Sequence, residues 1–406
     1  MSSVFGNRIK VSVFGQSHSE AIGVVIDSLP AGFEPDMEKL RRFTMRRTAI
    51  GKEGVTARKE PDEAEILSGL VNGKTCGAPL CAIIRNTDVR SSDYDSLKNK
   101  PRPSHADYTA FMKYGESADF HGGGHFSGRL TAPLVFAGGL IIQLLAQRGI
   151  RIGARVKSIG NAYDKYIDHA EVSEEILDEI AASDFPSYGD PRAMQKEISD
   201  AQTALDSVGG QVECFILGLG AGIGEPMFDG LESRISSAVF AIPAVKGIEF
   251  GEGFALTGIR ASEANDEFYI ADDGTVKTRT NSNGGILGGI STGMPIVFST
   301  AFKPTPSIAR EQKSVDLHTQ AAYRRSRNDD RHGYRNSRKA RSVHRGKSSS
   351  VRGKRRRDRS RRSYTLTDKT EGSTQKWTWK NSETKSMKST IRSSSFSKKE
   401  CRARLG

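Results

Sequence analysis

The sequence predicts an α+β fold, and three observations lead to this prediction. Short alternating or continuously apolar stretches, typical of strands, recur from the N-terminus to about residue 302. Amphipathic stretches with helical spacing are interspersed among them. One segment, Leu130 to Leu145, is apolar almost throughout, as expected for a buried helix. Strands that read as antiparallel, mixed with helices in this way, favour α+β.

The first half of the chain reads as strands around one early helix. Residues 36–47 predict a helix N-capped by Asp36, whose last turn carries a basic cluster. That cluster, which includes Arg47, either complements the helix dipole or binds an anionic ligand. A second helix is expected after Arg129. Strands are expected over residues 9–14, 24–26, 65–71 and 80–84.

The second half continues the same mixture. Helices are expected over residues 171–182, 191–207 and 230–242. Strands are expected over residues 151–159, 211–217 and 294–302, and a strand with a loop over 247–258. Gly284 to Gly289 predict a glycine-rich loop, and the last strand leads into the turn Lys303–Ser307.

The stretch from Arg102 to Pro133 carries the strongest indication of a ligand site. It places His105 in a proline-bounded turn and follows it with three glycines, Gly122 to Gly124. Successive glycines let a ligand approach the backbone, and a helix start just after them would bind an anion. A loop without a ligand shows the same pattern, so both interpretations stay open on this feature alone. His18, in an earlier turn, either caps its loop or pairs with His105 in catalysis.

The net charge of +13 is unevenly distributed along the chain. Residues 319–406 hold 28 of the 61 Lys and Arg and 7 of the 48 Asp and Glu, a net charge of +21, which leaves −8 on residues 1–318. Only 17 of these last 88 residues are apolar, too few to bury a core. We therefore divide the chain into a catalytic body, residues 1–318, and a basic, disordered tail, residues 319–406.

The remaining features exclude several classes of protein. The N-terminus lacks the apolar segment of a signal peptide, and Pro133 interrupts the most apolar stretch, which is short for a bilayer span. Four cysteines without paired spacing predict reduced, mostly buried thiols and no metal site. No HExxH, P-loop or Rossmann motif is found. The residues alone thus indicate a cytosolic enzyme that binds an anion and a cofactor.

Seven motifs, in order along residues 1–318, closely resemble those of the chorismate synthase family. They are FGQSHS at Phe14–Ser19, RPSHADYT at Arg102–Thr109, GGGHFSGRLTAP at Gly122–Pro133, DSVGG at Asp206–Gly210, IPAVKGIEFGEGF at Ile242–Phe254, GGILGGIS at Gly284–Ser291 and KPTPSI at Lys303–Ile308.

The resemblance implies a β-α-β sandwich and a carbon–oxygen lyase of the shikimate pathway, in aromatic amino acid biosynthesis. The family's reaction is a 1,4-anti elimination of phosphate from 5-enolpyruvylshikimate 3-phosphate, which gives chorismate, needs reduced FMN and is redox-neutral overall. The resemblance also implies a homotetramer, with NADPH as an optional source of reduction. A cytoplasmic location is expected from the residues themselves, and neither a membrane nor a specific nucleic acid is expected as a partner. A flavin- and NADPH-binding oxidoreductase is the alternative function.

The resemblance also implies roles for single residues. His18 matches an acid near the leaving phosphate, and His105 matches the histidine that protonates the reduced flavin. Arg47 matches a contact to the phosphate of a nicotinamide nucleotide, although Lys52 or Glu53 stands where the family has a second arginine. The positions that match flavin contacts are His125, Phe126, Ser127, Pro243, Ala244, Gly288, Lys303, Pro304, Thr305, Pro306 and Ser307.

The end of the chain departs from the family. After Leu317 the family continues to GRHDPC, whose Arg contacts flavin and whose Asp assists proton removal, and that block is absent here. A nucleic-acid-binding arm, a disordered linker and an out-of-frame translation are the alternatives. Permitted codons for Arg338–Ser350, read one nucleotide later, give GRHDPCIVVRAV. We therefore favour a frame change near residues 317–323. Whether this copy of the enzyme is active without the GRHDPC block stays open.

Overall fold

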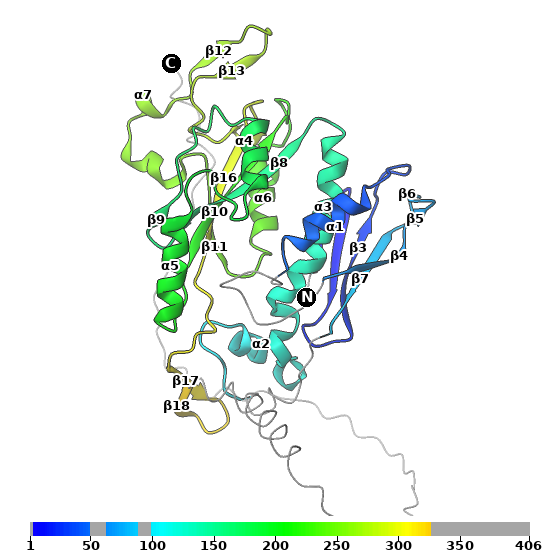
Figure 1. Cartoon of the computed structure of the whole chain (residues 1–406), viewed down its shortest axis with the longest axis vertical. Helices are drawn as coiled ribbons and strands as arrows, with labels where there is room; N and C mark the ends of the chain where they lie inside the picture. The colour runs from blue at the N-terminus through cyan, green and yellow to red at the C-terminus, as the bar shows by residue number, and fades with distance from the viewer. Residues whose placement is uncertain (1–2, 49–61, 88–98, 326–406) are drawn as a thin grey trace, which may run out of the picture. The chain divides into compact units, whose positions relative to one another are not determined.

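The computed structural model describes residues 3–48, 62–87 and 99–325, which all belong to one unit, Met1–Arg345. These residues form two five-stranded antiparallel sheets with helices packed against them (Figure 1). The predicted α+β class is confirmed. The predictions for residues 326–406 and for the loop Gly51–Gly54 lie outside the described residues.

The first sheet orders its strands β1-β2-β3-β7-β4. These strands are β1 Val4–Phe5, β2 Lys10–Gly15, β3 Ala21–Asp27, β7 Leu80–Arg85 and β4 Ala64–Ser68. Ile22, Val24 and Ile26 are at most 1% exposed, because every second side chain of β3 points to the same face of the sheet. The strand predicted over 65–71 is interrupted at Gly69, after which β5 Leu70–Val71 pairs with β6 Lys74–Thr75.

Two helices cover the buried face of this sheet. Helix α1, Met37–Met45, has the predicted N-cap, since the backbone N–H of Lys39 donates to Asp36 at 2.8 Å. It contacts α3, Thr131–Ala146, at Gly139. A Cβ at Gly139 would lie 2.7 Å from Cδ1 of Leu40, so glycine lets the two helices pack this closely without displacing that side chain.

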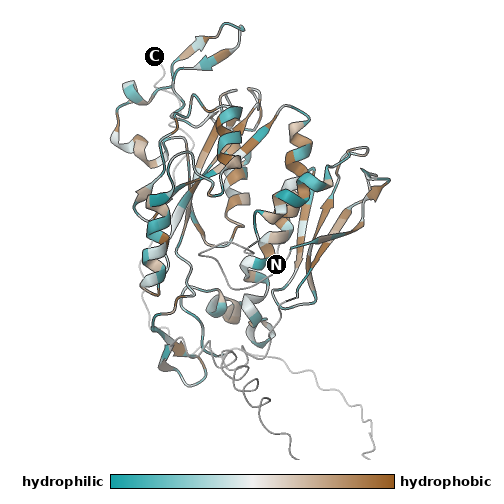
Figure 2. Cartoon of the chain, in the orientation of Figure 1, coloured by the Kyte–Doolittle hydropathy of each residue, from teal (hydrophilic) through white to brown (hydrophobic). Residues whose placement is uncertain are grey.

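Helix α3 also contacts β8 of the second sheet, and it therefore touches both sheets. This arrangement agrees with the β-α-β layering that the resemblance implies. By length and composition, Gly128–Ala146 is the one described helical segment that could cross a bilayer. Its side chains Phe136 and Leu140 are instead buried against the first sheet, and brown residues concentrate in the strands and in α3 (Figure 2). The helix is therefore explained as the core helix that the sequence predicts.

The second sheet orders its strands β11-β16-β10-β8-β9. They are β11 Val245–Phe250, β16 Ile296–Phe302, β10 Gly210–Leu217, β8 Arg151–Ile159 and β9 Ala162–Tyr163. Helices α4, Glu174–Ala182, and α5, Arg192–Thr203, pack on β8, and α6, Leu231–Val239, packs on β11. Phe215 packs with α4 whereas the next residue, Ile216, packs with α6, so both faces of β10 are covered.

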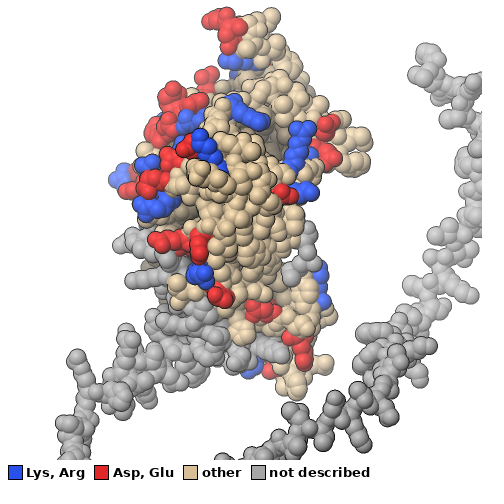
Figure 3. Space-filling model, turned by 90° about the vertical axis from the view of Figure 1, so that its right-hand side faces the viewer, with Lys and Arg blue, Asp and Glu red and all other residues tan. Residues whose placement is uncertain are grey.

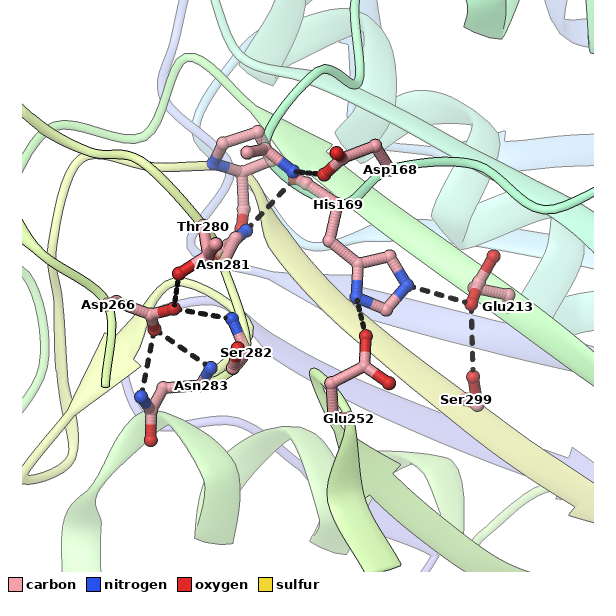
Figure 4. Close-up of polar contacts among 12 residues, drawn as sticks. Asp168, His169, Glu213, Glu252, Asp266, Thr280, Asn281, Ser282, Asn283 and Ser299 are labelled. Atoms are coloured by element: carbon pink, nitrogen blue, oxygen red, sulfur yellow. Dashed lines mark hydrogen bonds and ion pairs between the residues drawn. The ribbon is translucent and has the colours of Figure 1, made fainter. Parts of the chain in front are cut away.

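A buried ion cluster lies on β10, and Figure 4 shows its members His169, Glu213 and Glu252. The carboxylate of Glu213 is fully buried and accepts from Nε of Arg155 at 2.8 Å. Nζ of Lys157 lies 3.0 Å and Nε2 of His169 lies 3.3 Å from its other oxygen, and Nδ1 of His169 lies 3.5 Å from Glu252. Burial raises the pKa of Glu213, but the hydrogen bond from His169 and the charges of Lys157 and Arg155 outweigh burial and lower the pKa to about 2.

Several small elements complete the described chain. The helices are α2 Asp107–Tyr114 and α7 Ala261–Ala264, and the 3-10 turns are η3 Gly115–Ser117, η4 His121–Phe126, η5 Gly128–Leu130, η6 Met227–Asp229 and η7 Gly253–Gly258. The hairpins pair β12 Phe268–Ile270 with β13 Val276–Thr278, β14 Ile286–Leu287 with β15 Ile290–Ser291, and β17 Gln312–Asp316 with β18 Ala321–Arg325.

Two expectations from the sequence are corrected here. Disorder was expected from residue 319 onward, but residues 321–325 form a strand because they pair along their whole length with β17. The thiols were predicted to be mostly buried, but Cys76, directly after β6 of the small hairpin β5–β6, is exposed, and Cys81 and Cys214 are only partly buried.

Candidate active site

A cavity of about 320 Å³ lies where three segments meet. They are a first turn, Arg102–Asp107, a second turn, Lys303–Ser307, and the glycine run, Gly122–Gly124. The size of the cavity is that of a site for one small ligand, at the lower end of the usual range of about 300–1,000 Å³. The lining residues are Arg102, His105, Ala106, Asp107, Ala110, Asp119, Phe120, Gly122, Gly123, Phe126, Ser127, Gly128 and Ser307.

Arg102 and Asp107 fix the first turn of the cavity wall. The backbone N–H, Nε and Nη2 of Arg102 donate to the carboxylate of Asp107 at 2.9, 2.7 and 2.8 Å. Asp107 is the first residue of α2, where a carboxylate also complements the helix dipole. Burial raises the pKa of the Asp107 carboxyl, but the hydrogen bonds and charge of Arg102 outweigh burial and hold the pKa below its usual value. The pair therefore presents a fixed guanidinium at the cavity.

His105 lies between these two residues in the sequence and contacts both turns. Its Nδ1 lies 3.0 Å from the carbonyl oxygen of Pro103, and its Nε2 lies 2.9 Å from Oγ of Ser307. A second contact joins the two turns, because Nζ of Lys303 donates to the carbonyl oxygen of Ser104 at 2.6 Å. The imidazole is thus oriented at the cavity by protein groups on both of its nitrogens.

The three glycines adopt backbone conformations that only glycine reaches easily. Gly122, Gly123 and Gly124 have φ values of +60°, +88° and +54°. They lie within the 3-10 turn η4, whereas α3 begins only at Thr131. The helical segment that follows begins at Gly128, where η5 leads into α3, so the anion site expected after the glycines stays a prediction. The glycines form part of the cavity wall, with Arg102 beside Gly123.

His18 lies directly against this wall. A Cβ on Gly122 would stand 2.1 Å from Cε1 of His18 and 2.7 Å from Oγ of Ser17. The backbone N–H of Ser17 also donates to the carbonyl oxygen of Gly124 at 3.0 Å. The His18 turn and the glycine run are therefore packed as one unit, although His18 itself does not line the cavity.

Comparisons with known proteins agree with these motifs. The sequence model of the family described as chorismate synthase matches residues 9–343. The chorismate synthase of Thermococcus kodakarensis is 47% identical over 312 residues, which cover 77% of this chain and 86% of the relative. That of Pyrococcus abyssi is 45% identical over 315 residues, with 77% and 86% covered. The chain belongs to the chorismate synthase family.

A solved structure supports the same assignment. A crystal structure titled as that of a chorismate synthase superposes with a TM-score of 0.61 at 27% sequence identity, and the match covers 74% of this chain and 86% of that one. The two sheets and their helices therefore represent the fold of this family.

The positions matched to flavin contacts in chorismate synthases fall into two groups. Phe126, Ser127 and Ser307 line the cavity. His125 does not line it, because its Nδ1 lies 2.7 Å from the carbonyl oxygen of Gly15 and its Nε2 lies 2.9 Å from Oγ of Ser3. His125 ties the N-terminal segment to the glycine run.

The other matched positions lie beyond the cavity lining. Ala244, which follows Pro243, has a φ of +74° and accepts the backbone N–H of Lys303 at 3.0 Å. Gly288 lies in the turn of the hairpin β14–β15. In the rest of the Lys303–Ser307 turn, which includes Pro304 and Pro306, the carbonyl oxygen of Thr305 accepts from Oγ of Ser207 at 2.7 Å. The flavin roles of these residues stay predictions.

Arg47 is held by contacts within the protein. It forms an ion pair with Asp62 and donates to Oγ1 of Thr131 at 3.0 Å and to the carbonyl oxygen of Gly128 at 3.1 Å. The buried Asp62 also pairs with Arg129, so one carboxylate joins two arginines at the start of α3. The nicotinamide contact of Arg47 stays a prediction, and Lys52 and Glu53 lie outside the described residues.

Sequence reasoning missed several residues of the site. The ion pair of Arg102 with Asp107 was contained in a recognised motif, and its signal is an arginine five residues before an aspartate at a helix start. Asp119 lines the cavity and its carboxylate lies 2.9 Å from Nδ1 of His121, a contact with no pattern in the sequence. Among the described residues, no group of three or more His, Cys, Asp or Glu side chains could hold a metal ion.

Proposed function

We propose that this chain catalyses the 1,4-anti elimination of phosphate from 5-enolpyruvylshikimate 3-phosphate to give chorismate, in the shikimate pathway. The observation that carries the proposal is the cavity in which His105, Arg102 and the glycine run meet. All three belong to motifs shared with the family. The reaction needs a proton-transfer group and a cation at an anionic ligand, and these residues supply both.

The cavity fits reduced FMN by its chemistry. Gly122 and Gly123 offer backbone with no side chain in the way, Phe126 offers an aromatic ring, and Arg102 offers a fixed positive charge. A planar, anionic ligand suits such a wall, since it combines apolar contact with charge-assisted hydrogen bonds. When bound, the reduced flavin supplies the electron density that assists cleavage of the carbon–oxygen bond without net oxidation.

The protein's own contribution is to bind, orient and move protons. Arg102, fixed by Asp107, neutralises negative charge in the cavity. Nε2 of His105 holds or releases a proton beside it, because imidazole titrates near neutral pH. His18, against Gly122, is the proposed acid toward the leaving phosphate once substrate is bound. NADPH is the proposed source of reduction, with Arg47 as its phosphate contact.

The proposed assembly is a cytoplasmic homotetramer. Seen from the side that bears the first sheet, the centre of the surface carries few charged residues (Figure 3). Val4, Phe14 and Leu67 of that sheet are among its exposed apolar side chains, with Leu67 55% exposed. Such a surface suits a second copy of the chain. Light scattering of Leu67→Glu tests this, and an unchanged assembly would exclude this face as an interface.

The boundary between a catalytic body, residues 1–318, and an out-of-frame tail is also proposed. Its support is that permitted codons for residues 338–350, read one nucleotide later, give the GRHDPC block. Sequencing the gene should reveal one inserted or deleted base near codons 317–323. A clean reading frame, together with salt-resistant and sequence-selective RNA binding, would favour a natural basic arm instead, since non-specific binding weakens steeply with salt.

The decisive experiment measures phosphate release and redox balance together. The chain as written and its frame-restored form are incubated without oxygen with 5-enolpyruvylshikimate 3-phosphate and catalytic amounts of reduced FMN. We expect chorismate and phosphate in equal amounts from the frame-restored form, without consumption of reductant. Stoichiometric oxidation of NADPH without phosphate release would instead establish the oxidoreductase alternative.

A further inference from the structure

Two turns far apart in the sequence are joined at the cavity by side chains. Lys303 donates to the carbonyl oxygen of Ser104, and Ser307 meets His105, 202 residues away. Ser104 has a φ of +58°, a conformation that serine rarely adopts, so the turn before His105 depends on contacts that hold it. The Lys303–Ser307 turn supplies two such contacts, one to the backbone and one to the imidazole.

The partners of His105 determine where its hydrogen lies. The carbonyl oxygen of Pro103 can only accept, so Nδ1 carries the hydrogen in that contact. Nε2 of the neutral ring is then the basic nitrogen, and Oγ of Ser307 donates to it at 2.9 Å. The nitrogen that exchanges the proton is therefore the one that Ser307 contacts.

The other ionisable groups of the cavity wall are engaged elsewhere. Arg102 pairs with Asp107, and Asp119 lies 2.9 Å from Nδ1 of His121. Lys303, in the same turn as Ser307, donates to the carbonyl oxygen of Ser104. Ser307 lines the cavity together with His105 and contacts Nε2, so its hydroxyl connects that nitrogen with the ligand space.

We propose that Ser307 is a positioning residue for His105 and the group through which His105 exchanges its proton with the cavity. The inference rests on the proposed function, which gives His105 a role in proton transfer. When His105 is protonated, Nε2–H donates to Oγ of Ser307. As that proton moves to Oγ, the hydroxyl proton of Ser307 passes to a basic atom of the bound anionic ligand. One proton enters the serine and one leaves it, His105 becomes neutral, and no electron is transferred.

The deciding test uses nitrogen NMR on the full chain with ¹⁵N-labelled histidine, with His105 assigned by its loss in His105→Gln. In the wild type we expect an Nδ1–H tautomer and an Nε2 resonance shifted by a hydrogen-bond donor. In Ser307→Ala the Nε2 resonance should move downfield, toward that of a ring nitrogen without a donor. Ser307→Thr keeps the hydroxyl and should restore the wild-type resonance.

Ser207→Ala is the matched control. It removes a hydroxyl that donates to Thr305 in the same turn but does not contact His105. If Ser207→Ala moves the Nε2 resonance as far as Ser307→Ala does, the effect is general loosening and the inference fails. An unchanged resonance in Ser307→Ala also overturns it.

Kinetics of the frame-restored enzyme separate this inference from the proposed function. We expect Ser307→Ala to lower kcat by up to about 10²-fold with little change in KM, the lower end of what positioned proton transfer contributes. Ser307→Thr should recover most of this loss. Absence of phosphate release by the frame-restored wild type would refute the lyase proposal while leaving the NMR result valid. A normal kcat in Ser307→Ala would refute the relay alone.

Discussion

The imidazole of His18 is in direct contact with the backbone of Gly122. The place where a Cβ on Gly122 would stand is 2.1 Å from Cε1 and 2.3 Å from Nδ1 of the ring. Since Gly122 lines the cavity, this contact sets the distance between His18 and any ligand bound there. Glycine is required at this position for the contact as well as for its positive φ.

Gly122→Ala should therefore displace His18 and impair catalysis more than stability. An added methyl group strains the backbone and overlaps the ring, which costs about 1–3 kcal/mol in packed regions. We expect a large fall in kcat of the frame-restored enzyme, measured as phosphate release. Gly138→Ala in α3 is the control, because nothing lies within 4 Å of its Cβ position and alanine favours a helix. Equal kinetics for the two variants would contradict this reading.

Replacing His105 or His18 with alanine should lower turnover of the frame-restored enzyme by about 10²–10⁴-fold, the usual contribution of a positioned acid or base. Flavin affinity, measured by fluorescence titration, should stay nearly unchanged because neither substitution removes the glycine wall or Arg102. His318→Ala, in the exposed turn before β18, serves as the control. If activity survives and only thermal stability drops, the two histidines merely hold their loops.

Asp107→Asn should destabilise the protein by about 3 kcal/mol, because removing one partner of a largely buried ion pair leaves the other charge uncompensated. Arg102 and Asp107 have side chains only 14% and 13% exposed. Urea unfolding measures the change. A double-mutant cycle with Arg102→Gln should show strong coupling between the two sites, and additive losses would mean that the contact contributes little.

The Glu213 cluster predicts loss of stability in acid. Its pKa is lowered in the folded state from the ordinary value of 4.5 to about 2, so its stabilisation is fully present above about pH 5 and is lost as pH falls toward 2. A shift of this size corresponds to about 3 kcal/mol. Glu213→Gln should unfold more easily at pH 7 and show a weaker dependence on pH between about 5 and 2. A variant with the wild-type acid dependence would show that other carboxylates control it.

The sequence predicted best those elements whose pattern is local. Alternation in β2 and β3 and the side chain of Asp36 are sufficient to place a strand pair and a helix start. The sequence does not predict helix α2. Its first residue, Asp107, also accepts from the guanidinium of Arg102, so its position alone does not identify a helix start. Likewise, β18 reads as part of a polar tail, and only its pairing with β17 makes it a strand.

The candidate site shows the same limit. The motifs named His105, Phe126, Ser127 and Ser307, and the structure brings all four to one cavity. No sequence pattern shows that His125 turns to Ser3 and Gly15, because those contacts depend on where the N-terminal segment lies. The hydrogen bond between His105 and Ser307 cannot be predicted from the sequence either, since the two residues are 202 positions apart and lie in different turns.

The separation of His105 from Ser307 also has a consequence for biosynthesis on the ribosome. At about 5–20 residues per second, Ser307 is synthesised roughly 10–40 s after His105, which precedes it by 202 residues. The first sheet and α3, complete by residue 146, can fold while His105 still lacks its partner. Contacts of such long range form slowly, so the site is expected to be assembled last. A nascent chain that stalls before residue 303 would thus have a folded first sheet, but its His105 turn would lack the contacts from Lys303 and Ser307. Chaperones and proteases can distinguish such an exposed turn from that of the complete enzyme.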